Sequence, residues 1–356
     1  MNFLGKLIKN DINYTIINIQ IISTDNFMEY EDKEKKIFKK MVFRGGEIKQ
    51  FIHGGEALTL AGAGTETPLA KSVYQNLVGE ETYPLSHFPG YEETTILSPD
   101  GELGLVMTTR FSPKTSSEIL GLVPRPLSIL TASGINMYVY MYAVKGAREL
   151  REGNIGPAVV NIEESKKNSS YMGYDIHEEG WAFCSPISWH PNSKKAMFSE
   201  ISRKDRIKRI RIVHFDDYIP GNIYKDKTTP DNIVYAKSLD ILNKTYEKEI
   251  NGYYKGKEGI IIVNVTNDMS QTEYVNYTED GKTFYNGYEK FRTINLLTGQ
   301  LESNITVTGE NTGKMELKIT MNLQGNIIYE EEGNIMTYGY AEYNGKNLTI
   351  EDSYDK

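Results

Sequence analysis

The stretch SWHPNSKKAMFSEISR, residues Ser188 to Arg203, decides the fold. Its centre, His190-Pro191-Asn192-Ser193, has the composition of a β-turn, because proline fixes φ at the second position and asparagine tolerates the third. The apolar residues Ala196 to Phe198 that follow suit a strand. We therefore interpret His190 as a turn residue whose side chain hydrogen-bonds the turn, rather than as a catalytic group.

The same pattern recurs along the chain. It begins with a polar or aromatic residue, continues in most copies with proline followed by Asp or Asn, and ends in an apolar strand. The other copies are LSPDGELGLVM at 97–107, TTPDNIVYAK at 228–237 and YTEDGKTFYN at 277–286. From the copy at Pro191 to the copy at 228–237 the spacing is about 40 residues, and from there to the copy at 277–286 it is about 50 residues. Both spacings are typical of a four-stranded propeller blade. The longer interval after Pro99 corresponds to two blades or to one blade with an insertion. We favour assigning 277–286 to a separate C-terminal unit.

Strand patterns dominate the rest of the sequence. Short runs rich in Ile, Val, Tyr and Thr predict strands at YTIINIQII, INMYVYMYAV, RIRIVHF, EGIIIVNV and MELKITM. Helices are predicted in two places only: at 67–79, where Thr67-Pro68 resembles a helix start and Gly79 a helix end, and at 114–123. The fold class is therefore all-β with helical decorations.

The two best turns, Ser98-Pro99-Asp100-Gly101 and Trp189-His190-Pro191-Asn192, resemble the blade repeats of TolB-like β-propellers, and MYVYMYAVKGAREL at 137–150 looks like the next strand of such a blade. The resemblance implies a propeller of about five to six degenerate blades and carries over no catalytic residues. The C-terminal part is similar to the tail that follows TolB-like propellers in some uncharacterised bacterial proteins. The residues that carry this second resemblance are Gly281, Asn286, Gly287, Gly309, Glu310, Gly313 and Met315.

These patterns predict three parts: an N-terminal strand or arm at 1–40, a TolB-like β-propeller at 41–268, and a small β-meander domain at 269–356. The single cysteine excludes an intrachain disulfide. No segment has the roughly 20 apolar residues of a membrane span, so we expect a soluble protein without a membrane span. Without a clear signal peptide, a cytoplasmic location is the default; the family resemblance suggests the cell envelope or export as the alternative.

The formal net charge of −8 gives no general attraction to nucleic acid, which we do not expect as a partner. The run RKDRIKRIR at 203–211 is locally basic. It is interpreted as a solvated loop leading into a strand, or alternatively as a patch for an anionic ligand or partner. The glycine-rich stretch at 53–68 is interpreted as a flexible connection, because it lacks the dinucleotide and P-loop patterns that cradle phosphate.

The densest group of reactive side chains is DIHEEGW at 175–181. Asp175, His177 and Glu179 are candidate ligands of a divalent metal, and His177, Glu178 and His214 are candidate catalytic groups. Asp175 and His177 would share one face of a strand. The simpler interpretation is a polar loop at the rim of a propeller, since no second ligand cluster accompanies the first.

Two functional hypotheses follow. The first is a non-catalytic binding module that takes a protein, a small molecule or a saccharide at the propeller funnel, with no cofactor. The second is a metal-assisted propeller lyase or hydrolase acting on a saccharide or peptide, which would require a divalent metal. The residues leave open whether the protein is an enzyme, because the second hypothesis depends on whether the candidate residues converge at one site.

Overall fold

The structure is a computed structural model of the 356-residue chain. It describes residues 2–23, 27–32, 34–35, 37–42, 46–63, 66–112, 117–148, 155–240, 251–328 and 337–350. Their strands form five sheets in which neighbouring strands are antiparallel, apart from one parallel pair, and these described strands close no barrel. The prediction of a mainly β protein is therefore confirmed.

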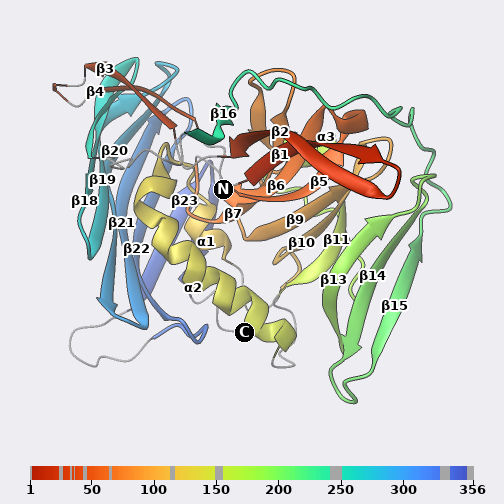
Figure 1. Ribbon diagram of the computed structural model, residues 1–356. Coiled ribbons are helices and arrows are strands. Elements are labelled where there is room, and N and C mark those ends of the chain that lie inside the picture. Colours follow the sequence, from red (N-terminus) through yellow and green to blue (C-terminus); the bar gives the residue numbers. More distant parts are fainter. Residues whose placement is uncertain are drawn as a thin grey trace.

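Three small sheets, here called the meander sheets, follow one another along the chain and lie on the right of Figure 1. In each of them, every strand pairs with the next strand in sequence. The first contains β5 (Glu47–Ile52), β6 (Ala57–Ala63), β7 (Ala70–Asn76) and β8 (Thr82–Pro84); the second contains β9 (Glu92–Leu97), β10 (Leu103–Thr108), β11 (Gly156–Asn161) and β12 (Tyr174–Asp175); the third contains β13 (Trp181–Trp189), β14 (Lys195–Ser202) and β15 (Lys208–His214). The 3-10 helix η1 (His53–Gly55) and helix α3 (Ile162–Lys167) lie in the connections.

The meander sheets stack face to face. Leu105 and Val106 are adjacent in β10 and point to opposite faces, as successive strand residues do. Val106 packs in a cluster with Ile52 of the first sheet, whereas Leu105 packs in another cluster with Phe198 of the third sheet. The second sheet thus packs on both faces, which explains why its central strands β10 and β11 are mainly apolar on both sides.

A single ten-stranded sheet forms the other half of the molecule, on the left of Figure 1. Its strands in spatial order are β24 (Lys346–Thr349), β23 (Tyr338–Tyr343), β22 (Gly313–Asn322), β21 (Thr298–Gly309), β20 (Thr283–Asn295), β19 (Met269–Thr278), β18 (Glu258–Val265), β17 (Gly252–Lys255), β4 (Ile37–Val42) and β3 (Phe27–Asp32). The predicted boundaries at 40/41 and 268/269 both fall within this sheet. The reason is that the sheet contains strands that precede the meander sheets in the sequence, β3 and β4, as well as strands that follow them.

Helix α2 (Ser128–Arg148) lies between the large sheet and the meander sheets, and contacts β19, β20 and β21 as well as β13 (Figure 1). The short helix α1 (Glu118–Gly121) precedes it. Arg125, between the two helices, forms a fully buried ion pair with Glu289 of β20. The Arg125 guanidinium also donates to the carbonyl oxygens of Leu120 (3.0 Å) and Val123 (2.9 Å). This pair anchors the helical segment on the large sheet.

An N-terminal hairpin of β1 (Asn2–Asn10) and β2 (Asn13–Ser23) pairs with the two-residue strand β16 (Lys237–Ser238). Ile22 of β2 packs against Leu58, Leu77 and Ile233, so the hairpin is fixed on the first meander sheet. This hairpin occupies the first part of the predicted N-terminal strand or arm at 1–40.

Three sequence predictions about local structure are wrong. The helix predicted at 67–79 is strand β7, in which six consecutive residues are buried; an amphipathic helix there would require a polar face. The strand predicted at INMYVYMYAV belongs to α2, where the helical stripe of Ile135, Tyr138, Val139, Tyr142 and Ala143 is buried. The copy at 228–237 forms no strand before β16.

The helix predicted at 114–123 is confirmed only for α1, and residues 113–116 lie outside the described part of the chain. The described residues form three meander sheets rather than a ring of five or six blades. The strands predicted at YTIINIQII, RIRIVHF, EGIIIVNV and MELKITM correspond to β2, β15, β18 and β22.

Candidate ligand-binding site

The first strands of the three meander sheets, β5, β9 and β13, lie side by side and are joined by side chains. Gln50 of β5 accepts a hydrogen bond from the Leu97 amide (2.7 Å) and donates one to the Leu97 carbonyl oxygen (3.0 Å). Trp189 of β13 donates from Nε1 to the carbonyl oxygen of Ile96 (2.8 Å). Each neighbouring pair of sheets is thus tied by one side chain that bonds to the backbone of β9.

The two turns predicted from the sequence are confirmed and touch each other. The Gly101 amide donates to the Ser98 carbonyl oxygen (2.8 Å), and the Ser193 amide donates to that of His190 (3.0 Å). Gly101 has a φ of 78° and Ser193 a φ of 59°, so in both turns the fourth residue adopts the left-handed conformation. The Asp100 amide donates to the Ser193 hydroxyl (3.3 Å), which joins the two turns.

His190 holds its own turn together, as predicted. Its Nδ1 lies 2.8 Å from Oδ1 of Asn192, to which it donates when it carries the proton, and 3.3 Å from the Asn192 amide nitrogen, from which it accepts in the other tautomer. Because Nδ1 is engaged in these contacts and the residue is exposed at a turn, His190 has a structural role.

Residues 215–236, here called the crossing segment, run without regular secondary structure from β15 back to the first meander sheet. The Tyr218 hydroxyl donates to Oδ2 of Asp100 (2.7 Å), and the Gly221 amide donates to the same oxygen (3.0 Å). Burial raises the pKa of Asp100, but hydrogen bonds from Ser98, Tyr218 and the backbone outweigh this effect and lower it. Further along, the Lys227 amide donates to the Gly54 carbonyl oxygen (2.7 Å). The ionised Asp100 therefore fixes the crossing segment over the turns.

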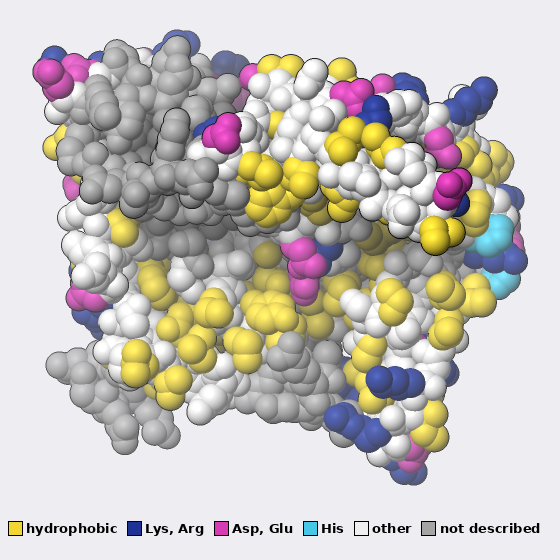
Figure 2. Space-filling view, viewed as in Figure 1, with side chains coloured by type: hydrophobic (Ala, Val, Ile, Leu, Met, Phe, Trp, Pro, Cys, Tyr) yellow, Lys and Arg dark blue, Asp and Glu magenta, His cyan; other side chains and the backbone are white. Residues whose placement is uncertain are grey.

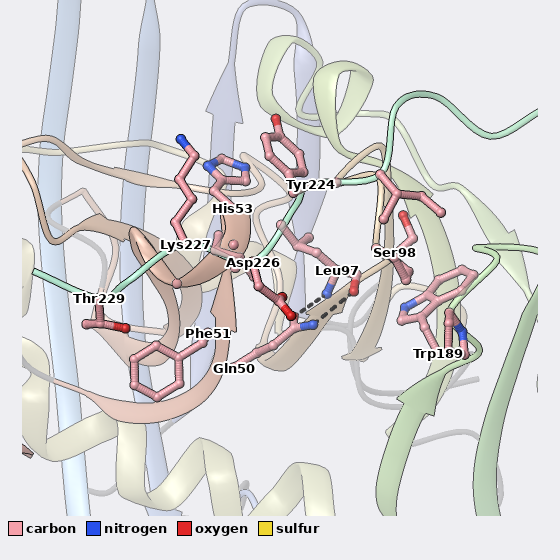
Figure 3. A pocket seen from close by; sticks show the side chains of 17 residues that line it. Gln50, Phe51, His53, Leu97, Ser98, Trp189, Tyr224, Asp226, Lys227 and Thr229 are labelled. Carbon is pink, nitrogen blue, oxygen red and sulfur yellow. Dashed lines mark hydrogen bonds between the residues drawn. The ribbon is translucent and has the colours of Figure 1, made fainter. Parts of the chain in front are cut away.

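A cavity of about 540 Å³, here called the turn-end cavity, opens where the three sheets and the crossing segment meet (Figure 3). Its wall combines aromatic rings with polar groups and glycine backbone. It is lined by Gln50, Phe51, Ile52, His53, Gly54, Gly55, Leu97, Ser98, Pro99, Gly101, Trp189, Pro191, Ile223, Tyr224, Asp226, Lys227 and Thr229.

Two of the aromatic rings are well exposed to solvent: Phe51 is 50% exposed and Tyr224 is 45% exposed. His53 stacks on Tyr224 with ring centroids 4.4 Å apart, and burial lowers the pKa of His53. The imidazole is therefore neutral at neutral pH and extends the aromatic surface. Lys227 is neutralised by an ion pair with Glu56 (2.6 Å).

The predicted metal and catalytic residues lie elsewhere. Asp175 is exposed in β12, and its Oδ1 accepts a hydrogen bond from the His177 amide (2.8 Å). His177 Nε2 lies 3.1 Å from the Trp181 carbonyl oxygen. Glu178 pairs with Arg209 (2.7 Å), whose hydrogen bond lowers the Glu178 pKa, and Glu179 is exposed. Each of the first three side chains is thus engaged in local structure.

His214 is far from this group. It pairs with Lys195 at one end of β14, whereas Trp181, beside His177, pairs with Ser202 at the other end. At about 3.3 Å per strand residue, these ends are roughly 20 Å apart. Among the described residues, no three His, Cys, Asp or Glu side chains are grouped to hold a metal ion. The structure therefore does not bring His177 and His214 into one site.

Sequence reasoning identified the two turns that line the turn-end cavity, but it did not predict that they form a site with β5, η1 and the crossing segment. His53, Gly54 and Gly55 have positive φ values of 53°, 72° and 104°. The start of the glycine-rich stretch is therefore the defined turn η1 and not merely a flexible connection. Pro220-Gly221, which begins the crossing segment's path over the turns, was a signal in the sequence. Neither the Pro220-Gly221 pair nor the glycine-rich stretch predicts that the crossing segment hydrogen-bonds to η1.

Comparison with known proteins gives little further information. No family model matches the chain, and no curated protein matches it. Among solved structures, TolB from Acinetobacter baumannii matches with a TM-score of 0.27 and 12% identity over 86% of this chain. The chain covers 60% of that TolB chain. A eukaryotic initiation factor matches with a TM-score of 0.17 and 8% identity, over 83% of this chain and 90% of that one.

Neither structural match is close enough to carry an argument about fold or function. No helix among the described residues is long and apolar enough to cross a membrane. The functional argument therefore depends on the geometry of the turn-end cavity.

Proposed function

We propose that the meander sheets are a partial β-propeller of the TolB-like kind and that the protein is a non-catalytic binding module. Its ligand is a saccharide that binds in the turn-end cavity. The observation that carries this proposal is an open cavity of about 540 Å³ with exposed aromatic rings beside a free carboxylate. Ligand-binding cavities generally have volumes of about 300–1,000 Å³ and combine an apolar lining with a few polar groups.

The chemistry of the wall favours a sugar. The C–H faces of sugar rings are flat and apolar, and they stack on exposed rings such as those of Phe51 and Tyr224. Asp226 lies at the cavity wall and is exposed, with no hydrogen bond to another described residue. A carboxylate accepts hydrogen bonds from two neighbouring hydroxyl groups, and such bonds to a charged group are strong. Stacking and hydroxyl recognition together suit a polyhydroxylated ring.

The same wall favours binding over hydrolysis. Glycoside hydrolysis generally uses two carboxyl groups that flank the bond to be broken. Asp226 is the one acidic residue among the described residues that line the cavity. His53 is stacked on Tyr224, and Lys227 is paired with Glu56. This set of residues supports recognition of a ligand without bond cleavage.

The two tryptophans provide an internal control for the test. Trp189 lines the turn-end cavity, whereas Trp181 lies at the opposite end of β13 with the Arg209 guanidinium 3.6 Å above its ring. The variant W181F retains Trp189, and the variant W189F retains Trp181. We would titrate both with oligosaccharides of glucose, mannose, N-acetylglucosamine and galacturonate. At least one should change the emission of W181F in a saturable manner without changing that of W189F.

A second pair of variants tests the carboxylate. Asp226→Ala should weaken binding of the same oligosaccharide at least tenfold, as expected for the loss of charge-assisted hydrogen bonds. Asp217→Ala is the matched control, because Asp217 is an exposed carboxylate of the crossing segment outside the cavity lining. The saccharide proposal is wrong if no oligosaccharide changes Trp189 emission, or if both alanine variants bind equally well.

A further inference from the structure

The third meander sheet ends in an open edge at β15. In the first two meander sheets the third strand pairs with a fourth, β8 or β12. In the third sheet, β15 pairs with β14, and none of the strands in the described ranges pairs with its outer edge. Such an edge presents backbone N–H and C=O groups to which another strand can be added.

The two faces of β15 differ in what they offer. On one face, Arg209 and Arg211 turn toward the sheet and pair with Glu200, which is almost fully buried. On the other face, Ile210 is 66% exposed and Ile212 is 55% exposed. Met197, opposite Ile212 in β14, extends the same exposed apolar face. An added strand would therefore cover apolar surface that water now contacts.

The surroundings of this edge are basic. Lys204, Arg206 and Lys208 are exposed at the β14–β15 turn and at the start of β15, and Asp205 is the one acidic residue in the run 203–211. Figure 2 shows dark blue side chains beside yellow ones toward the lower end of this part of the molecule. The edge therefore attracts negative charge through long-range electrostatics.

The charges also indicate which kind of strand fits. If two copies paired through β15 in antiparallel register about Arg211, the Arg211 side chains of the two copies would face each other. Like charges directly opposite each other destabilise a strand pair. An added strand with alternating residues would instead place its apolar side chains on the face of Ile210 and Ile212 and its carboxylates on the opposite face, which carries Arg209 and Arg211. Lys204 and Arg206, in the turn at the end of this edge, attract such an acidic strand by long-range electrostatics.

We propose that β15 binds an extended, acidic segment of a partner protein, which adds to the third meander sheet as a fourth strand. Main-chain hydrogen bonds provide affinity in this type of recognition, and alternate side chains provide specificity. The positive charges serve two purposes, because they prevent pairing between copies and select an acidic partner. This surface is separate from the turn-end cavity, so the proposal is independent of saccharide binding.

The test uses a fluorescein-labelled peptide of four Glu-Val repeats as the probe. We expect saturable binding to the full chain by fluorescence anisotropy, and slower hydrogen exchange at residues 208–214 when the peptide is present. Two further peptides separate the contribution of main-chain hydrogen bonds from that of charge. The same peptide N-methylated at alternate residues cannot form the ladder, and a Lys-Val peptide has the opposite charge; both should bind at least tenfold more weakly.

A pair of protein variants locates the site. Ile210→Glu places a carboxylate on the exposed face of β15 and should weaken binding of the Glu-Val peptide at least tenfold. Ile16→Glu changes an equally exposed isoleucine on the N-terminal hairpin and should leave binding unchanged. Circular dichroism melting checks that both variants fold. Equal binding of the N-methylated peptide, equal binding to both variants, or a dimer in sedimentation analysis that Ile210→Glu dissociates would each overturn the proposal.

Discussion

The two halves of the molecule consist of antiparallel strands but are held together in different ways. The ten-stranded sheet is a nearly continuous backbone ladder whose one face packs with α2 in a single apolar cluster. The meander sheets are three separate ladders with separate, smaller clusters between them. Their relative positions depend on individual polar side chains such as Gln50 and Trp189. The large sheet is thus suited to stability, whereas the meander sheets are suited to shaping a cavity.

The buried ion pair between Arg125 and Glu289 offers the strongest way to break the connection between the halves. Removing one member of a buried pair leaves an uncompensated charge, so Arg125→Ala should lower the free energy of unfolding by about 3–5 kcal/mol. The double variant Arg125→Met/Glu289→Leu should lose less than Arg125→Ala, because neither charge is left. Urea denaturation followed by circular dichroism measures both values.

The same experiment tests whether the halves unfold together. Both tryptophans lie in β13, so tryptophan emission reports on the meander sheets alone. Because α2 contacts β13 as well as β19 to β21, we expect emission and circular dichroism to shift to the same lower urea concentration in Arg125→Ala. A shift in circular dichroism without a shift in emission would show that the two halves are independent units.

Lys71 provides a pH-dependent test in the meander half. Its ammonium group is fully buried in β7 and donates to the Gly90 carbonyl oxygen (2.7 Å) and to that of Phe88. Burial lowers the pKa of Lys71 to about 8, from 10.5. The unfolded chain therefore binds more protons than the folded protein between these values, and stability rises with pH across this window.

We expect the stability of the wild-type protein to rise by about 3 kcal/mol relative to Lys71→Met between pH 8 and 10.5. Below pH 8 the difference between the two proteins should be constant. Taking the difference removes the contribution of tyrosines such as Tyr74, whose pKa is raised to about 12. A constant difference across the whole range, measured by urea denaturation, would show that Lys71 titrates normally in the folded protein.

The parts of the structure that could be predicted from the sequence are those with local causes. The turns at Ser98 and His190 were identified because proline, asparagine and glycine restrict the backbone within four residues. Helix α2 was missed because its tyrosines and β-branched residues favour strands on average, while the buried helical stripe that begins at Ile135 decides its structure. Tertiary packing overrode propensity there, as it did in β7.

The candidate site could not be predicted for a different reason. Phe51, Trp189 and Asp226 come from β5, β13 and the crossing segment, so their proximity depends on how the meander sheets stack. The densest cluster of reactive residues in the sequence, which begins at Asp175, is instead occupied by local hydrogen bonds and an ion pair. Density along the chain was therefore a poor guide to a site that is assembled from distant segments.

Gln50 and Gln300 provide the finest comparison between the halves. Gln50 joins β5 to β9 across two sheets. Gln300 of β21 acts within one sheet: it donates to Thr320 of β22 (2.7 Å) and accepts from the Arg292 guanidinium of β20 (2.6 Å). Replacing Gln50 by alanine should cost about 1 kcal/mol, as is usual for a neutral hydrogen bond, whereas replacing Gln300 should cost about 1.5–3 kcal/mol, because it also removes bonds to the charged Arg292. The structural consequences should differ, because the Leu97 amide donates to Gln50 itself, while the strands around Gln300 keep their backbone ladders. Gln50→Ala should therefore accelerate hydrogen exchange at Leu97 and weaken saccharide binding, and Gln300→Ala should do neither. Equal exchange at Leu97 in both variants would contradict the view that single side chains position the meander sheets.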